Sequence, residues 1–176
     1  VGSPMRPPMR KPAPEGRSYR LRRRLTLAAN PFLRDHVIGG HAVLPTVCAA
    51  NWMIGACEQI YPGYRFFRAE NYRALKGIVF DETLVDEYVL DLKLHPAEES
   101  GRLDLEAQIS SEAKNGRPRY HYAMEITLLL DLPVPTDDVQ PTDLTGAGTQ
   151  VDGALLYRDG ARPREDRALF HGPSFQ

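Results

Sequence analysis

The chain has 176 residues, of which 42% are hydrophobic, so it is long enough and apolar enough to fold around a core of its own. Its formal net charge of −1 excludes a global attraction to nucleic acid or to an anionic membrane. No apolar run approaches the roughly 18–20 residues that span a bilayer, and the amino terminus lacks the apolar stretch of a signal peptide. We therefore expect a cytoplasmic protein that has no membrane or nucleic-acid partner.

The amino-terminal stretch is strongly basic. Residues 1–24 hold eight Arg or Lys and one Glu, a charge of +7 that the remaining residues offset with −8. Tyr19 is its one aromatic residue, which argues against a nucleic-acid-binding arm, because such segments combine basic and aromatic side chains. Residues 1–17 include five prolines and are predicted to be a linker or residues left from cloning.

A strand and then a helix are predicted next. The alternating apolar residues of the strand are Tyr19, Leu21, Leu25 and Leu27. After Pro45, residues 46–60 are apolar nearly all round and are predicted to form a helix that is buried on every side. Cys48 and Cys57 on that helix would lie roughly 13.5 Å apart along its axis, too far for a disulfide. We expect two core thiols in a reducing compartment.

Four further segments have the pattern of strands. They are residues 66–80, which Gly77 allows to bend, 88–94, 102–109 and 120–130. Turn residues between the last three predict hairpins. His95 at one turn, and His121, which alternates away from Tyr120 and Tyr122, are expected at the surface. One helix followed by an antiparallel meander indicates an α+β layout in which a curved sheet wraps one central helix, the hotdog fold.

Composition also suggests how the chain is divided. We expect a hotdog domain over 18–133 and a linker over 134–154, which is rich in Pro, Thr, Asp and Gly. Residues 155–176 then begin a second unit, and the chain stops directly after a turn signal and an aromatic residue. We expect that the chain was cut there, or that the remainder of the unit lies on another chain.

The segment D-H-V-I-G-G-H-A-V-L-P, residues 35–45, carries the candidate chemistry. His36 lies just before the predicted helix, and Gly39 and Gly40 let the backbone approach a ligand without a Cβ atom in the way. The helix that follows Pro45 directs backbone N–H groups and a positive dipole end toward the same place. A base beside such donors suits abstraction of a proton next to a carbonyl, with the enolate oxygen held by N–H groups.

A metal site is not expected around these residues. His41 follows His36 by five positions, and no Cys or carboxylate lies around them at the usual spacing of zinc ligands. His41 is expected at the rim of a pocket or exposed. Asp35 is expected to be a solvated turn residue, because neighbouring residues on a strand point to opposite faces.

Two motifs resemble those of a known family. His36, Gly40 and Pro45 occupy the fixed positions of H-x-x-x-G-x-x-x-x-P, and H-G-P-S-F-Q at residues 171–176 is similar to a G-P-x-F-Q element about 130 residues further on. This pair, in this order and at this spacing, resembles the dehydratase domains of polyketide synthases and of related polyunsaturated fatty acid synthases. The resemblance covers residues 18–176.

The resemblance implies a double hotdog of which this chain is the first half. In that family His36 would take the α-proton of a 3-hydroxyacyl thioester on an acyl carrier protein, and an aspartate of the second half would protonate the leaving hydroxyl. The Gly40 N–H would hold the thioester oxygen, and Pro45 and His171 would belong to the substrate-binding site. The implied partners are the acyl carrier protein, the second hotdog half and other synthase domains. No cofactor is implied, because the elimination is acid–base chemistry.

The sequence departs from the family pattern in two places. The aspartate-bearing helix would lie beyond Gln176. A homodimer of single hotdogs is an alternative, but the stand-alone dehydratases carry a glutamate six residues after the helix-start proline, where this chain has Asn51, and an amide has no proton to give at neutral pH. His171 stands where the family often has Tyr.

Two other functions are compatible with the sequence. A dehydratase-like module without catalysis would bind a carrier protein or shape a megasynthase. A hotdog thioesterase would need an activated water and a carboxylate near the start of the helix, and the acids nearby are Asp35 and the more distant Glu58.

Overall fold

The computed structural model describes residues 16–96, 99–113 and 115–134 of the chain. The predicted linker at 1–17, apart from its last two residues, lies outside this part, as do residues 135–154 of the second predicted linker and the whole segment 155–176. The described elements are β1 (Ser18–Arg23), the 3-10 helix η1 (Pro31–Asp35), β2 (Val37–Ile38), β3 (His41–Ala42), α1 (Thr46–Ile60), β4 (Arg65–Ala74), β5 (Tyr88–His95), β6 (Arg102–Glu112) and β7 (Pro118–Leu129).

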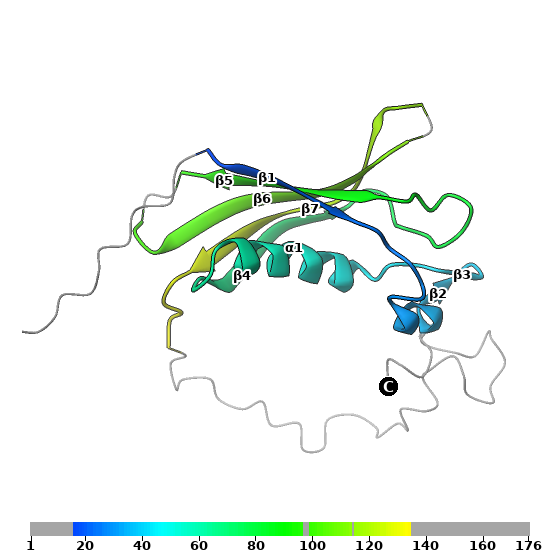
Figure 1. The fold of residues 1–176 in the computed structure, drawn as a ribbon. Coiled ribbons are helices and arrows are strands. Elements are labelled where there is room, and N and C mark those ends of the chain that lie inside the picture. Colours follow the sequence, from blue (N-terminus) through cyan, green and yellow to red (C-terminus); the bar gives the residue numbers. More distant parts are fainter. Residues whose placement is uncertain (1–15, 97–98, 114, 135–176) are drawn as a thin grey trace, which may run out of the picture.

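One antiparallel sheet covers one helix. The five strands are ordered β1-β5-β6-β7-β4, and every neighbouring pair is antiparallel. Figure 1 shows the sheet curving over α1, with β2, β3 and η1 gathered at the end where α1 begins. The predicted α+β layout, with a meander of hairpins after the helix, is confirmed.

The core lies between the sheet and α1. Along β5 and β6, alternate residues are buried because successive side chains of a strand point to opposite faces, whereas most of β7 is buried on both faces. The pairing places these buried residues opposite one another, so they form one apolar layer: Leu90, Leu92 and Leu94; Ile109, Ala107 and Leu105; Tyr122, Met124 and Ile126. The predicted inward faces of these three strands are confirmed, with the exception of Tyr120, which is 45% exposed.

The prediction that α1 is buried on every side is wrong for the described residues. Ala49, Met53 and Cys57 lie one helical turn apart and pack under the sheet with no exposed surface. On the opposite side Asn51 is exposed and Val47 keeps 70% of its surface exposed. A single sheet can cover only one side of a helix, and apolar composition alone does not show which layers surround it.

The long strand predicted over residues 66–80 ends early. β4 pairs with β7 as far as Ala74, and the next two backbone amides both turn toward the carbonyl of His121. The chain then leaves the sheet, and Val79 forms an isolated antiparallel bridge with Val43, just before α1. The chain therefore departs from the sheet before the bend expected at Gly77.

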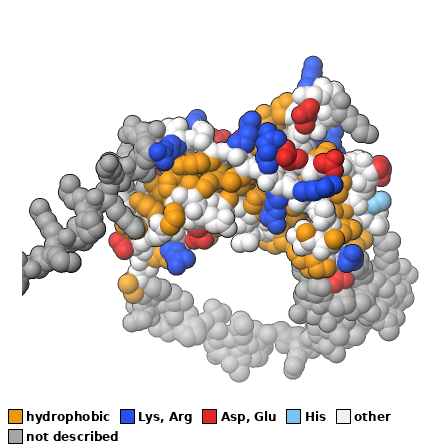
Figure 2. Space-filling model, viewed as in Figure 1, with side chains coloured by type: hydrophobic (Ala, Val, Ile, Leu, Met, Phe, Trp, Pro, Cys, Tyr) orange, Lys and Arg blue, Asp and Glu red, His pale blue; other side chains and the backbone are white. Residues whose placement is uncertain are grey.

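Ion pairs neutralise arginines of β1 and Arg24, which directly follows the strand. Arg20 pairs with Asp91, Arg22 with Glu87 and Arg24 with Asp86. All of these side chains are exposed, so solvent screens the charges and each pair adds little to stability. Figure 2 shows basic and acidic side chains interleaved on this face. The strand also ends at Arg23 rather than reaching Leu27.

His121 is buried rather than at the surface, because a β-bulge interrupts β7. Ile109 pairs with Tyr122 while its neighbour Ser110 pairs with Tyr120, so His121 is the extra residue between two paired positions. A bulge shifts the alternation of inward and outward side chains by one residue. His121 and Tyr122 are both buried as a result, and Tyr120 is exposed.

The His121 ring has hydrogen-bond partners at both nitrogens. Nδ1 lies 2.9 Å from the carbonyl oxygen of Lys76, and Nε2 lies 2.8 Å from the hydroxyl of Ser111. A carbonyl only accepts, so Nδ1 carries the proton and the Ser111 hydroxyl donates to Nε2. Burial lowers the pKa of His121 below its ordinary value, and the charges of Arg119 and Lys76 lower it further.

This burial predicts a loss of stability in acid. Unfolding returns the ring to water, so between its lowered folded pKa and its ordinary pKa of about 6.5 the unfolded chain binds more protons than the folded chain. The contribution of neutral His121 is therefore present above about pH 6.5 and is lost as the pH falls through the folded pKa. We expect His121→Asn to reduce the slope of unfolding free energy against pH in this range, as measured by urea unfolding.

The matched control is Leu94→Val, a core substitution in β5 that removes no titratable group. It should leave the slope as in the unmodified chain. Equal slopes for the unmodified chain and His121→Asn would contradict the assignment of a buried, neutral ring.

Candidate active site

A tight hairpin precedes α1 and holds the predicted site residues. β2 and β3 pair Val37 with Ala42 and Ile38 with His41, which leaves Gly39 and Gly40 as a two-residue turn. Both glycines have positive φ, +62° and +90°, as two-residue turns of this kind require. A Cβ at either position would meet no atom of the described residues within 4 Å. Within this part of the chain the glycines are needed for backbone conformation rather than for space.

The turn sets the partner of His36. Continuing the register of the hairpin outward by one pair places His36 opposite Val43, and the Val43 N–H donates to the His36 carbonyl at 3.0 Å. The His36 ring is 7% exposed, and its Nδ1 lies 2.8 Å from the Val43 carbonyl oxygen. The carbonyl can only accept, so Nδ1 carries a proton, and in the neutral ring Nε2 carries the lone pair. This is the tautomer in which Nε2 can act as a base.

The short helix η1 fixes the other side of His36. The backbone N–H of His36 donates to the Leu33 carbonyl at 3.1 Å, which closes the last turn of η1. Leu33 is completely buried and anchors this turn in the core. The backbone on both sides of the histidine is therefore held by hydrogen bonds, and the ring is restrained at Nδ1.

The start of α1 lies next to this hairpin in the chain. Pro45 is buried and directly precedes the helix, and its carbonyl accepts the N–H groups of Cys48 and Ala49 at 3.0 and 3.2 Å. The structure thus brings His36 and the helix start together through the residues that link β3 to α1. Gly40 lies at the exposed tip of the hairpin. His171 lies outside the described residues.

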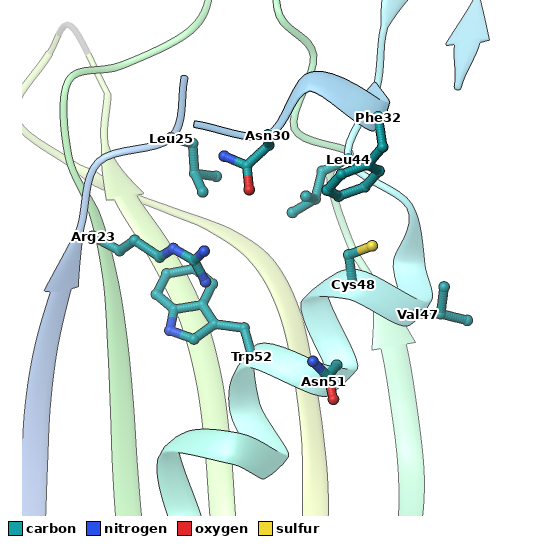
Figure 3. Close-up of a pocket in the computed structure, with 9 residues that line it drawn as sticks. All are labelled: Arg23, Leu25, Asn30, Phe32, Leu44, Val47, Cys48, Asn51 and Trp52. Carbon is teal, nitrogen blue, oxygen red and sulfur yellow. The ribbon is translucent and has the colours of Figure 1, made fainter. Parts of the chain in front are cut away.

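A cavity of about 420 Å³ borders the open side of α1 (Figure 3). Its lining residues are Arg23, Leu25, Asn30, Phe32, Leu44, Val47, Cys48, Asn51 and Trp52. The Arg23 guanidinium lies 5.4 Å from the centre of the Trp52 ring, a cation–π contact at one wall. His36, Gly40 and Pro45 are not among the described residues that line it.

One partner in the site was not predicted from the sequence. The Val43 carbonyl selects the tautomer of His36, yet a backbone group gives no residue signal. The two-glycine turn could have revealed it, because a two-residue loop at 39–40 places 38 opposite 41, 37 opposite 42 and 36 opposite 43.

The described part of the chain has neither a metal-binding cluster nor a membrane-spanning helix. There, three or more His, Cys, Asp or Glu side chains do not come together in a group that could hold a metal ion. None of the described helices has both the length and the apolar character needed to cross a membrane.

Comparison with solved structures defines the fold class. The chain resembles the dehydratase domain from the CurJ module of curacin polyketide synthase with a TM-score of 0.54 and 12% identity, over 87% of this chain and 48% of that domain. The dehydratase domain from the CurF module is also similar, with a TM-score of 0.48 and 15% identity over 73% of this chain and 43% of that one. The described residues form a hotdog fold, as predicted.

Sequence comparison adds the family. The family model described as polyketide synthase dehydratase domain matches residues 9–112, and the chain belongs to this family. A polyunsaturated fatty acid synthase from Thraustochytrium sp. is 27% identical over 157 residues, which are 89% of this chain and 5% of that protein. The chain therefore spans a small part of that relative and about half of the CurJ dehydratase domain.

The backbone conformations of Gly39, in the turn, and Gly55, in α1, predict opposite effects of Gly→Ala on stability. Gly39→Ala should lower the free energy of unfolding by roughly 1–2 kcal/mol, because a side chain is strained in the left-handed region. Gly55→Ala should raise it by about 0.5–1 kcal/mol, because residue 55 lies in α1 and has open space for a methyl group. Urea unfolding monitored by circular dichroism measures both. A Gly39→Ala variant as stable as the unmodified chain would show that the turn differs from the one described.

The packing of α1 predicts selective labelling of the two thiols. Cys48 lines the cavity and is half-buried, and burial raises its pKa. Cys57 is fully buried, and its burial raises the thiol pKa to about 12. At pH 8.5, iodoacetamide should modify Cys48 slowly in the native chain and Cys57 only after unfolding, as read by fragmentation mass spectrometry of the tryptic peptide 35–65, which holds both thiols.

Cys48→Ser provides the control for that experiment. The native variant should then take up no label until denaturant is added. Equal rates at the two thiols of the native chain would mean that α1 does not pack against the sheet as described.

Proposed function

We propose that this chain is the first half of a dehydratase domain that eliminates water from a 3-hydroxyacyl thioester on an acyl carrier protein. The product is the enoyl thioester, and the pathway is polyketide or polyunsaturated fatty acid biosynthesis. One observation carries the proposal: the Val43 carbonyl holds the His36 proton on Nδ1, so Nε2 has the lone pair that a general base needs.

The reaction balances with one base and one acid. His36 Nε2 takes the proton from C2 of the acyl chain, and the electrons of that C–H bond form the C2–C3 double bond. The C3–O bond breaks, and the hydroxyl leaves as water after it receives a proton from the acid. As charge moves onto the thioester oxygen, the Gly40 N–H and the positive end of α1 after Pro45 stabilise it.

The acid is assigned to the second half of the domain. Asn51 occupies the helix position at which the single-hotdog enzymes carry their glutamate, and its carboxamide cannot donate a proton at neutral pH. Pairing two copies of this chain in a homodimer would therefore not complete the catalytic pair. His171, in the motif that opens the second half, is assigned to substrate binding.

The proposal implies particular partners. The substrate arrives as the phosphopantetheine thioester of an acyl carrier protein, and the other domains of the synthase, together with the second hotdog half, complete the assembly. The elimination moves protons and breaks one C–O bond, so these residues require no cofactor for it. A hydro-lyase of this kind is expected to work in the cytoplasm.

The test is hydration of an enoyl pantetheine thioester, or dehydration of the 3-hydroxyacyl form, followed by mass spectrometry. This chain is assayed beside a longer product that contains the second half, each with and without His36→Ala. We expect only the longer protein to turn over and His36→Ala to lower kcat/KM by at least about 100-fold, the contribution typical of a general base.

His41→Ala is the matched control, because His41 is an exposed histidine in the same hairpin. It should retain activity. Absence of turnover in both lengths of the protein would exclude the enzyme for these substrates. The better account would then be a non-catalytic dehydratase-like module that binds a carrier protein or organises the synthase, and pull-down with an acyl carrier protein would test that function.

A further inference from the structure

We propose that His121 and Tyr122 are positioning residues for His36 and act on it through residues 75–80, the 75–80 segment. The inference rests on the proposed role of His36 as the base. The hydrogen bonds of the His121 ring and of the Tyr122 hydroxyl go to Lys76, Ser111, Ile78 and Leu44. Each holds the 75–80 segment, and that segment orients the peptide group that selects the His36 tautomer.

The first link is a single peptide plane. The Val43 carbonyl oxygen accepts the His36 Nδ1 proton at 2.8 Å, and the N–H of the same peptide group, that of Leu44, donates to the Ile78 carbonyl at 2.9 Å. A trans peptide is planar, with its C=O and N–H pointing in opposite directions. Fixing the N–H against Ile78 therefore fixes the direction in which the oxygen points toward His36.

A second hydrogen bond holds the preceding peptide group, between Ala42 and Val43. The Phe80 N–H donates to the Ala42 carbonyl at 2.8 Å, on the other side of Val43. Together with the Val43–Val79 bridge, the two bonds make a short antiparallel pair between the 75–80 segment and the end of the hairpin. The position of the segment thus determines the orientation of the Val43 carbonyl.

The second link is the bulge in β7, which holds the start of the segment. The His121 carbonyl accepts the N–H groups of Leu75 and Lys76 at 2.8 and 3.2 Å. The His121 ring donates from Nδ1 to the Lys76 carbonyl at 2.9 Å, and the Ser111 hydroxyl donates to Nε2 at 2.8 Å. One residue therefore holds Lys76 at both its N–H and its carbonyl.

Tyr122 holds the middle of the same segment. Its hydroxyl accepts the Ile78 N–H and donates to the Leu44 carbonyl, each at 3.4 Å. The phenol thus bridges Leu44 and Ile78. These two residues are also joined directly by the hydrogen bond from the Leu44 N–H to the Ile78 carbonyl. Without the bulge, His121 and Tyr122 would point to opposite faces of the sheet, so the bulge is what directs both side chains to the 75–80 segment.

A purely structural role of His121 and Tyr122 and a role in positioning His36 predict different states of the His36 ring when the two side chains are replaced. If these side chains only stabilise the fold, replacing them lowers stability and leaves His36 unchanged in the molecules that remain folded. If they position His36, the folded variants show a changed His36 tautomer. The tautomer is read directly from the ring nitrogen chemical shifts of the 176-residue chain labelled with ¹⁵N-histidine.

The experiment compares three variants with a control of matched stability. His121→Phe keeps a ring but removes both hydrogen bonds, His121→Asn keeps a donor for the Lys76 carbonyl, and Tyr122→Phe removes only the hydroxyl. Leu94→Val, in the core near the far end of β5, is the control. Spectra are recorded at neutral pH, and exchange of the Leu44 amide is followed in parallel.

We expect the Nδ1–H form of His36 to dominate in the unmodified chain, in His121→Asn and in Leu94→Val. In His121→Phe and Tyr122→Phe the Nε2–H form should appear, and the Leu44 amide should exchange at least about tenfold faster, which corresponds to about 1.4 kcal/mol of lost local protection. In the longer, active protein the same two variants should lower kcat by about 10- to 100-fold, by analogy with the effect of groups that orient metal-ligating histidines.

An unchanged His36 tautomer and unchanged Leu44 exchange in folded Tyr122→Phe and His121→Phe would overturn the proposal. Should His121→Phe fail to fold, Tyr122→Phe decides alone. This failure is distinguishable from failure of the proposed function. If His36→Ala abolishes turnover while the tautomer does not respond, only the positioning role is wrong. If the His36 tautomer changes in the two variants but His36→Ala retains turnover, His121 and Tyr122 do position His36, and the catalytic role of His36 is wrong.

Discussion

The hydrogen bond between the His36 ring and the Val43 carbonyl is the interaction on which the arrangement of this site depends. It exists because Gly39 and Gly40 reverse the chain in two residues, which places position 36 opposite position 43. A longer loop or a different turn would change the register and give the ring another neighbour. The same residues lead directly into α1, so the turn also determines where the helix begins relative to the histidine.

The large sheet also restrains the hairpin that carries His36, through the 75–80 segment. The 75–80 segment leaves the edge of the sheet after β4 and joins β7 to the residues just before α1. Residues that are far apart in the sequence therefore meet around Val43. A site on a small hairpin is restrained by the large sheet through this connection, rather than by the hairpin alone.

Periodicity was enough to predict the sheet but not its irregular positions. Leu90, Leu92 and Leu94 follow the period of two, and their inward direction was predicted correctly. The same rule predicted that His121 points outward, but the side chain is buried. One extra residue in β7 shifts the alternation, and nothing in the residue types marks that position. The bulge also explains why β4 ends early, because the backbone amides of Leu75 and Lys76 turn toward the His121 carbonyl. Val47 is exposed because, among the described residues, the sheet covers only the other side of α1, and the composition of a helix cannot reveal this.

The candidate site was predictable to a different degree at each position. His36 and Pro45 were named by their motif; the structure places Pro45 directly before α1 and His36 opposite Val43, and their roles in a site stay a prediction. The acceptor of the His36 proton was not found, although counting outward from Gly39 and Gly40 would have given Val43. His171 is outside the described part of the chain, so its role continues to rest on the family resemblance.

The order of strands in the sheet has a consequence for how the chain acquires its fold. β5, β6 and β7 are joined by short hairpin connections, so they can pair soon after they meet and at a small cost in chain entropy. β1 must wait for a partner far along the chain, since Ser18 pairs with Lys93, and α1 and β4 lie between them. Proteins rich in such distant pairings fold slowly. During synthesis, the first strand and the hairpin that carries His36 leave the ribosome well before the sheet that will hold them in place.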